Sequence, residues 1–183
     1  VVSKAEGRLV PARDRDRAVL EESVRVVRRR GGMTISETRH GFICANAGVD
    51  ASNVTGEEVA LLPIDPDASA RRIRARIKHL TGVNVGVVIS DTFGRPWRLG
   101  QTDVAIGAAG IEVFLDYRGR TDTQGHELVA TRIAVADELA GAAELVMGKT
   151  DRVCAAVIRG SPVLFGRGGA VELVRAPAED LFR

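Results

Sequence analysis

Two short segments of the sequence place acidic and hydroxyl side chains directly after apolar residues. "AGVDASN" contains Asp50 and Asn53, and "ISDT" contains Ser90, Asp91 and Thr92. Carboxylate and hydroxyl oxygens are the ligands that hard cations such as Mg²⁺ and Mn²⁺ prefer, and these cations often bridge side chains to phosphate groups. The two segments therefore indicate a metal site. Asp and Asn after a strand are also common turn and cap residues, so this spacing alone leaves both interpretations open.

A third segment, "YRGRTDTQGHE", is a weaker candidate of the same kind, with Asp122, Gln124 and Glu127. The sequence contains neither of the two common phosphate-binding loops. "MGKT" at 147–150 resembles the end of one, but the upstream glycine is missing and a long predicted helix precedes it. We interpret this segment as a helix C-terminus, with Lys149 near the negative end of the helix dipole. A nucleotide site in this chain would therefore use another arrangement.

The segment "FGRPWRLGQTD" follows the second acidic pair and is dense in polar and stacking groups. Its glycines and proline restrict the shape of a loop that carries Arg95, Trp97, Arg98, Gln101 and Asp103. Arginine suits bidentate contact with carboxylate or phosphate, and an indole offers a flat face for stacking. The segment is a candidate binding loop. The alternative is an ordered surface loop whose tryptophan fills the core.

The bulk composition favours an ordinary globular protein. The chain has 183 residues, is 45% hydrophobic and 27% charged, and carries a formal net charge of +2. Its arginine runs alternate with apolar residues at helical spacing, and only 4% of its residues are aromatic, so we predict solvated helix faces and no nucleic-acid partner. Its apolar runs are far shorter than the ~20 residues that span a bilayer, and its two separated cysteines suit the cytoplasm.

The surrounding elements must position these groups. Apolar periodicity and turn residues predict a mixture of helices and strands, which indicates a single α+β (mixed α/β) domain over 1–183. The expected helices are 16–30, a helix that begins with an Asp65 cap and Pro66, 102–111 and 131–146. The expected strands are a β-like stretch over 33–50, 83–90, 111–117 and 153–160.

Taken together, these segments resemble the coenzyme F420-0:L-glutamate ligase (γ-glutamyl ligase) family. The matching segments run in the same order as in that family and cover most of the chain. They are "VVSKAEGRLV", "AGVDASNV", "ALLPIDPDASA", "ISDTFGRPWRLGQTDVAIGAAG" and "ADELAGAAELVMGK". The fourth segment is long and unusual enough to make the resemblance specific.

The resemblance implies a GTP-dependent ligase that adds L-glutamate to F420-0, a deazaflavin with a phospholactyl tail, and then adds further γ-linked glutamates. It implies Mg²⁺ or Mn²⁺ as cofactor, with K⁺ as an additional candidate. GTP would phosphorylate the lactyl carboxylate to an acyl phosphate, which the glutamate amine would then attack. Such phosphoryl transfer depends on positioning and charge neutralisation, which acidic metal ligands and basic side chains can supply.

Specific residues take roles from the resemblance. Asp50, Asp91 and Thr92 match metal-binding positions, and Asp50 and Asp91 are the expected catalytic pair. Asn53 and Lys4 match residues that contact GTP. For Arg95, Trp97, Arg98, Gln101 and Asp103, we expect a place near F420-0 or its acidic tail. The base that takes the proton of the glutamate amine is not identified by the resemblance.

The resemblance also implies an F420 gamma-glutamyl ligase-like fold that forms an interleaved homodimer. We expect one ligase domain that lacks the N-terminal segment of the family, with no C-terminal nitroreductase-like domain within this chain. Two other functions stay open at this point. One is a metal-dependent phosphohydrolase that uses Asp50 and Asp91, and the other is a non-catalytic module that binds a nucleotide or a deazaflavin.

Overall fold

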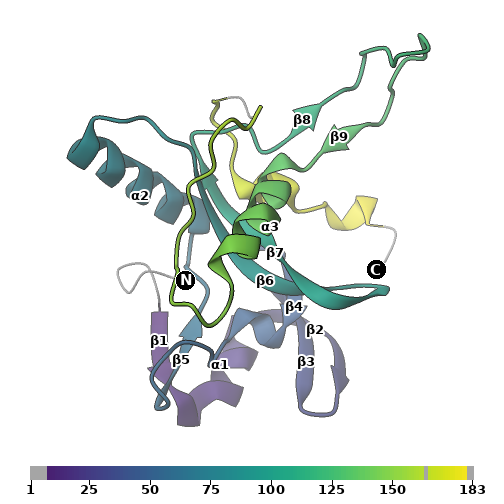
Figure 1. Ribbon diagram of the computed structural model, residues 1–183. Helices are drawn as coiled ribbons and strands as arrows, with labels where there is room; N and C mark the ends of the chain where they lie inside the picture. Colours follow the sequence, from purple (N-terminus) through teal and green to yellow (C-terminus); the bar gives the residue numbers. More distant parts are fainter. Residues whose placement is uncertain (1–7, 163–164, 181–183) are drawn as a thin grey trace.

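The computed structural model describes residues 8–162 and 165–180, and it confirms the predicted mixture of helices and strands. Two groups of elements are visible in Figure 1: a lower group built from the N-terminal part of the chain, and an upper group around one long hairpin. The lower group contains the helix α1, a two-stranded β1–β5 ribbon and a β2–β3–β4 meander, and its strands pair antiparallel. Its elements are β1 Arg8–Pro11, α1 Arg15–Glu22, β2 Ser23–Arg30, β3 Met33–Thr38, β4 Ile43–Ala45 and β5 Glu58–Leu61. Its buried core comprises Ala18, Val19, Val49, Val59 and Leu61.

The predicted helix over 16–30 is wrong in its second half. Helix α1 ends at Glu22, and Ser23 has an extended backbone with φ −90° and ψ 120°. The following residues form β2, which pairs with β3 from Ser23 opposite Thr38 to Arg30 opposite Met33. Valine favours strands, and its spacing here fits either structure, so pairing with β3 decides the outcome. The arginine run therefore lies on an exposed strand and not on a helix face.

The upper group is centred on a hairpin of two long strands, β6 Val87–Arg95 and β7 Arg98–Ala109. The prediction of a helix over 102–111 is wrong, because this segment pairs along most of its length with β6. Its small residues allow a helix to approach closely: a Cβ atom on Gly107 would lie 2.4 Å from the carbonyl oxygen of Pro66. The predicted strand over 83–90 is confirmed from Val87 onward.

Two helices pack against β7, namely α2 Pro66–Thr81 and α3 Val135–Met147 (Figure 1). The predicted start of α2 is confirmed, because the Asp65 carboxylate accepts a hydrogen bond from the Ala68 N–H at 2.8 Å. The predicted helix over 131–146 is confirmed as α3, with a later start. The core of this group comprises Ala105, Ala108, Ile111, Val113, Ala136 and Ala170.

The remaining elements are short. β8 Leu115–Asp116 and β9 Arg132–Ile133 form the base of a hairpin that projects from the upper group (Figure 1). The predicted strand over 111–117 is reduced to β8. The predicted strand over 153–160 is wrong, since no ladder partner forms there among the described residues and Val157 stays exposed. The single turns of 3₁₀ helix are η1 Ala12–Asp14, η2 Asn46–Gly48, η3 Ala170–Leu173 and η4 Pro177–Glu179. Across the described ranges, no helix has the length and apolar character needed to cross a membrane.

Candidate functional site

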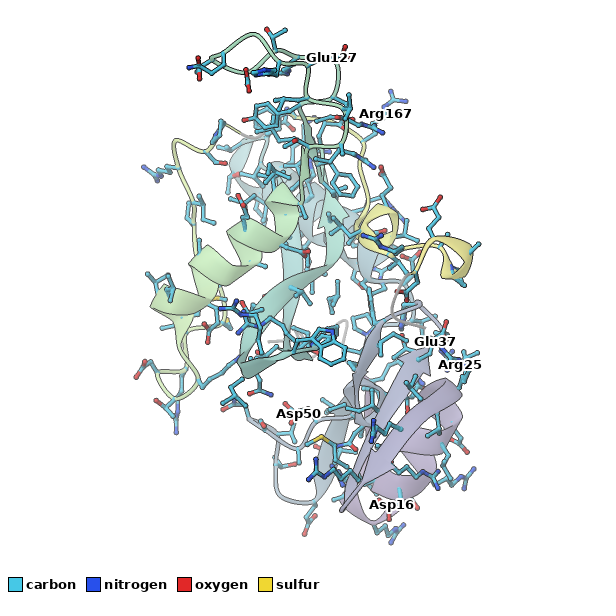
Figure 2. All side chains as sticks on the ribbon, turned by 90° about the vertical axis from the view of Figure 1, so that its right-hand side faces the viewer. Asp16, Arg25, Glu37, Asp50, Glu127 and Arg167 are labelled. Carbon is cyan, nitrogen blue, oxygen red and sulfur yellow. The ribbon has the colours of Figure 1, made fainter. Side chains whose placement is uncertain are left out.

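The two acidic segments meet where the lower group faces the β6–β7 hairpin. Asp91 lies on β6, which packs beside β4 of the lower group. Asp50 follows η2, and Figure 2 shows it at the edge of the lower group that faces the hairpin. Its Oδ1 accepts hydrogen bonds from the Ser52 N–H at 2.9 Å and the Ser52 hydroxyl at 2.8 Å. Asp50 is therefore a turn residue, as one of the two interpretations of its segment expected. The turn also holds its exposed carboxylate in place, so it stays available as a metal ligand.

Asp91 is the electrostatic centre of this region. Burial raises the pKa of its carboxyl, and the negative charges of Asp50 and Asp103 raise that pKa further. The Thr92 N–H, which donates to Asp91 Oδ1 at 2.8 Å, and the positive charge of Lys149 act in the opposite direction. Two carboxylates thus act on a third, Asp91, at a partly desolvated position. A cation bound here would relieve their repulsion.

Cys44 lies beside this cluster on β4 and is buried. Burial raises the pKa of its thiol to about 12, and the negative charge of Asp91 contributes to the shift. A thiol with such a pKa is protonated at neutral pH and is a poor nucleophile. The site therefore offers acidic oxygens and no reactive sulfur at this position.

Asp103 stands opposite Thr92 in the β6–β7 ladder and is buried. It accepts hydrogen bonds from the Thr92 hydroxyl at 2.6 Å and from the Ser90 hydroxyl at 2.8 Å. Because both hydroxyl protons point to Asp103, the oxygen lone pairs of Thr92 and Ser90 are directed elsewhere. The structure therefore groups Asp103 with Ser90 and Thr92, and not with the exposed loop beside which we expected it. Asp91 is next to Thr92 on β6 and faces the other side of the hairpin.

Lys149 completes this face of the hairpin, and it is the site residue that the sequence analysis missed. Its ammonium group contacts the Thr92 hydroxyl and lies 3.5 Å from Asp103 Oδ1. The interpretation of Gly148 and Lys149 as a helix terminus is also confirmed, since the Gly148 N–H donates to the Glu144 carbonyl at 2.9 Å at the end of α3. The available signal was that one of the segments behind the family resemblance ends at Lys149.

The oxygen donors of this region fit a hard divalent cation. Asp50 and Asp91 supply carboxylates. On the other face of β6, Thr92 supplies a hydroxyl oxygen that donates its proton to Asp103 and accepts from Lys149. Within residues 8–162 and 165–180, no group of three or more His, Cys, Asp or Glu side chains is arranged to hold a metal ion. Mg²⁺ is commonly bound through one or two carboxylates, with water and phosphate oxygens as its other ligands. The arrangement suits a cation shared with a phosphate better than a site made of protein ligands alone.

The arginine and tryptophan residues of the candidate binding loop lie at the far end of the hairpin. Trp97 occupies the turn with φ +63° and is 88% exposed, so the alternative in which its ring fills the core is excluded. Arg95 donates to the Leu99 carbonyl at 3.2 Å, while Arg98 and Gln101 are exposed. These four side chains form one exposed group that is separate from Asp103.

The other candidates are placed as follows. Asn53 is exposed with φ +57°, close in sequence to Asp50. Lys4 lies outside the described residues. Asp122 accepts hydrogen bonds from the Gln124 and His126 N–H groups, and these bonds lower the pKa of its carboxyl. Figure 2 shows Glu127 at the tip of the β8–β9 hairpin, far from Asp50, so the third acidic segment forms a turn away from the site.

Comparisons with known proteins cover the whole of this region. The family model described as F420-0:Gamma-glutamyl ligase matches residues 11–160. The chain is 46% identical to the coenzyme F420:L-glutamate ligase of Methanocaldococcus jannaschii over 166 residues, which are 90% of this chain and 66% of that protein. It is 48% identical to the ligase of the same name from Methanothermobacter thermautotrophicus over 169 residues, 91% of this chain and 67% of the relative. The chain thus spans about two thirds of the length of these relatives.

Proposed function

Because this chain belongs to the F420-0:gamma-glutamyl ligase family, we propose that it is a GTP- and metal-dependent ligase that adds L-glutamate to coenzyme F420-0. Further γ-linked glutamates would be added in the same way. The observation that supports this proposal most is the partly desolvated Asp91, whose pKa is raised by burial and by the charges of Asp50 and Asp103, while the charge of Lys149 acts against this shift. Such a concentration of charge is expected where a cation and phosphate groups bind.

The reaction that we propose has two steps. The lactyl carboxylate of F420-0 takes the γ-phosphoryl group of GTP and becomes an acyl phosphate, and the glutamate amine then displaces phosphate to form an amide. Donor and acceptor are both anions in the first step. The protein must therefore hold them together against their repulsion, and this positioning supplies most of the catalysis.

The residues at this site have different proposed roles in holding the metal and the phosphate groups. Asp50, Asp91 and Thr92 would hold Mg²⁺ or Mn²⁺, which when bound neutralises the charge on phosphate oxygens. Asp103 fixes the Thr92 hydroxyl by accepting its proton, so the hydroxyl oxygen acts only as an acceptor, and one of its lone pairs accepts from Lys149. Lys149 contacts the same hydroxyl and places a positive charge beside it, suited to a phosphate oxygen.

The substrates are assigned to the two sides of this centre. We assign GTP to the side of Asn53 and Lys4, as the family resemblance implies. We assign F420-0 or its acidic tail to the exposed end of the hairpin. Arg95 and Arg98 offer guanidinium groups there, and the indole of Trp97 is exposed for stacking on a flat ring.

We also propose that the chain works as a homodimer. Exposed apolar side chains support this, with Val24 and Val27 on β2 and Leu145 and Val146 near the end of α3. Exposed apolar surface of this kind is typical of protein interfaces. Light scattering on the purified protein tests the assembly, and a monomeric mass at working concentration would contradict it.

The activity is tested by incubating the protein with F420-0, GTP, Mn²⁺ and L-glutamate and measuring the mass of the deazaflavin product. We expect a glutamate adduct, together with GDP release that requires both F420-0 and glutamate. Phosphate release from GTP without either acceptor would instead indicate a phosphohydrolase. Nucleotide or deazaflavin binding without any turnover would indicate a non-catalytic module.

A further inference from the structure

A small cavity of about 230 Å³ lies where the turn before β4, the β6–β7 hairpin, the start of α3 and the C-terminal segment meet. Its apolar wall includes Phe42, Phe93 and Val104, and its polar groups are Asp137, Arg175 and Asp180. The volume is below the roughly 300–1,000 Å³ of pockets for drug-sized ligands, so the cavity suits a molecule of amino-acid size and not a tricyclic deazaflavin.

The cavity adjoins the candidate catalytic centre. Val104, which lines it, is the ladder partner of Asp91. Phe93 lies two residues beyond Asp91 on the same strand, and residues two apart on a strand face the same side. The cavity therefore opens on the face of the hairpin that carries Asp91, next to the strand neighbours of Asp91, although Asp91 itself does not line it.

The polar groups of the cavity match an amino acid. Asp137 donates no proton and uses only Oδ1 inside the protein, where it accepts the Ala105 N–H at 2.8 Å. Among the described residues its second oxygen has no hydrogen-bond partner. Arg175 is exposed, and its one hydrogen bond within the described chain is a long one of 3.4 Å to the Glu179 carbonyl. A carboxylate oxygen and a guanidinium on the walls of one cavity are complementary to an ammonium and a carboxylate.

We propose that this cavity binds the incoming amino acid, with Arg175 on its α-carboxylate and Asp137 on its ammonium group, and that Asp137 is the base that takes the ammonium proton. The inference rests on the proposed ligase function. One proton passes from the ammonium to Asp137, and the amine lone pair then forms the C–N bond at the acyl phosphate carbon. The C–O bond to phosphate breaks, and the phosphate leaves with the remaining proton that the nitrogen must lose.

The surroundings of Asp137 suit this role. Burial raises the pKa of its carboxyl above the ordinary Asp value, which brings it closer to the range in which a base works at neutral pH. The hydrogen bond to Ala105 fixes the carboxylate against β7 at the start of α3. A fixed base beside the nucleophile avoids the cost of orienting it during the reaction.

Hydroxylamine provides the test, because it attacks acyl phosphates and is already uncharged at neutral pH. With F420-0, GTP and Mn²⁺, the unaltered protein should form a hydroxamate with hydroxylamine and an amide with L-glutamate. In Asp137→Asn the amide oxygen still accepts the Ala105 N–H. This variant should lose on the order of 10²-fold in amide formation, while hydroxamate formation changes by less than about twofold.

The matched control is Glu138→Gln, which removes the same charge from the next, exposed residue of α3 and should leave both products unchanged. A second variant, Arg175→Met, should raise the KM for glutamate about tenfold and leave hydroxamate formation unchanged. Equal loss of both products in Asp137→Asn, or loss of neither, would overturn the inference. If the unaltered protein forms neither product, the proposed ligase function fails, and the inference fails with it.

Discussion

Asp67 and Asp91 are two shielded carboxylates that face different surroundings. Asp67, in the first turn of α2, accepts backbone N–H groups from Ala108 at 2.7 Å and Ala170 at 2.8 Å, with Val171 at 3.4 Å. Asp91 accepts a single backbone N–H from its neighbour Thr92, and two further carboxylates contribute to its raised pKa. Asp67 is surrounded by hydrogen-bond donors, whereas Asp91 is partly buried near two further carboxylates.

This difference separates a structural carboxylate from a functional one. The three N–H groups that Asp67 accepts come from β7 and from the C-terminal η3, so one side chain joins three parts of the fold. The surroundings of Asp91 instead oppose its ionised form, which costs the folded protein free energy unless a ligand compensates. Replacing each residue should therefore affect different measurements.

The largest expected effect is the loss of activity in Asp91→Asn. We expect ligase turnover to fall on the order of 10³-fold, because a group that positions charged phosphates is removed. The pKa of Asp91 is raised in the folded state, so at pH 7 its ionised form destabilises the fold, and the uncharged variant should unfold at the same or a higher temperature in EDTA. Product mass and thermal unfolding measure the two effects.

The matched control for this variant is Asp116→Asn. Asp116 lies on β8, away from the site, and its carboxylate pairs with Arg118. Turnover of this control should stay near that of the unaltered protein. If Asp91→Asn lost stability and activity together, then Asp91 would belong with Asp67 as a structural residue.

The second effect should appear in stability. Asp67→Ala leaves the buried N–H groups of Ala108 and Ala170 without their acceptor, and each orphaned donor costs roughly 1–3 kcal/mol. We expect urea unfolding to show a loss of about 3–5 kcal/mol. Asp65→Ala, two residues earlier, removes the cap of α2 and an exposed ion pair with Arg71, and should cost about 1 kcal/mol. Equal losses in both variants would show that Asp67 does not join β7 to η3.

The parts of the fold that were predicted correctly depend on neighbouring residues, whereas the wrong predictions concern segments whose structure depends on distant partners. The start of α2 was predicted correctly because its signals, Asp65 and Pro66, are adjacent to the helix that they begin. The segments 23–30 and 102–109 were predicted as helix because their valines and small residues are compatible with it. Their partners β3 and β6 decide the structure, and pairing between strands cannot be obtained from the spacing within one of them.

The site was predictable to a similar extent. Asp50, Asp91 and Thr92 stand directly after apolar segments, which made them candidates, and the family resemblance then implied their metal-binding roles. The grouping of Asp103 with Thr92 depends on the register of the β6–β7 ladder. Lys149 reaches the same hydroxyl from a position 57 residues further along the chain, after α3. Such contacts depend on tertiary packing, which explains why Asp103 was assigned to the loop and Lys149 was not assigned to the site.

A smaller loss of activity is expected in Asp103→Asn. An amide offers one acceptor oxygen in place of the two that bind the Ser90 and Thr92 hydroxyls, and it does not pair with Lys149. Turnover should fall about 10–100-fold, as is usual for residues that orient a ligand of a metal. The control is Asp122→Asn in the β8–β9 hairpin, which should keep its turnover. A changed affinity for F420-0 with unchanged turnover would instead indicate that Asp103 helps to bind F420-0 or its acidic tail.

The smallest effect concerns Glu22, a carboxylate whose surroundings favour its ionised form. Burial acts to raise its pKa, but hydrogen bonds from Arg8 at 2.7 and 2.8 Å and the charge of Arg39 lower it overall. Glu22→Gln should therefore cost about 1–2 kcal/mol at pH 7. Because folding lowers this pKa, the stabilisation is present above the ordinary Glu value of about 4.3 and is lost as the pH falls through the folded value. Urea unfolding at pH 7 and near pH 3 measures the free energy of unfolding of both proteins. The difference between the unaltered protein and Glu22→Gln should shrink on acidification. A constant difference would mean that packing, and not the ion pairs, accounts for the loss.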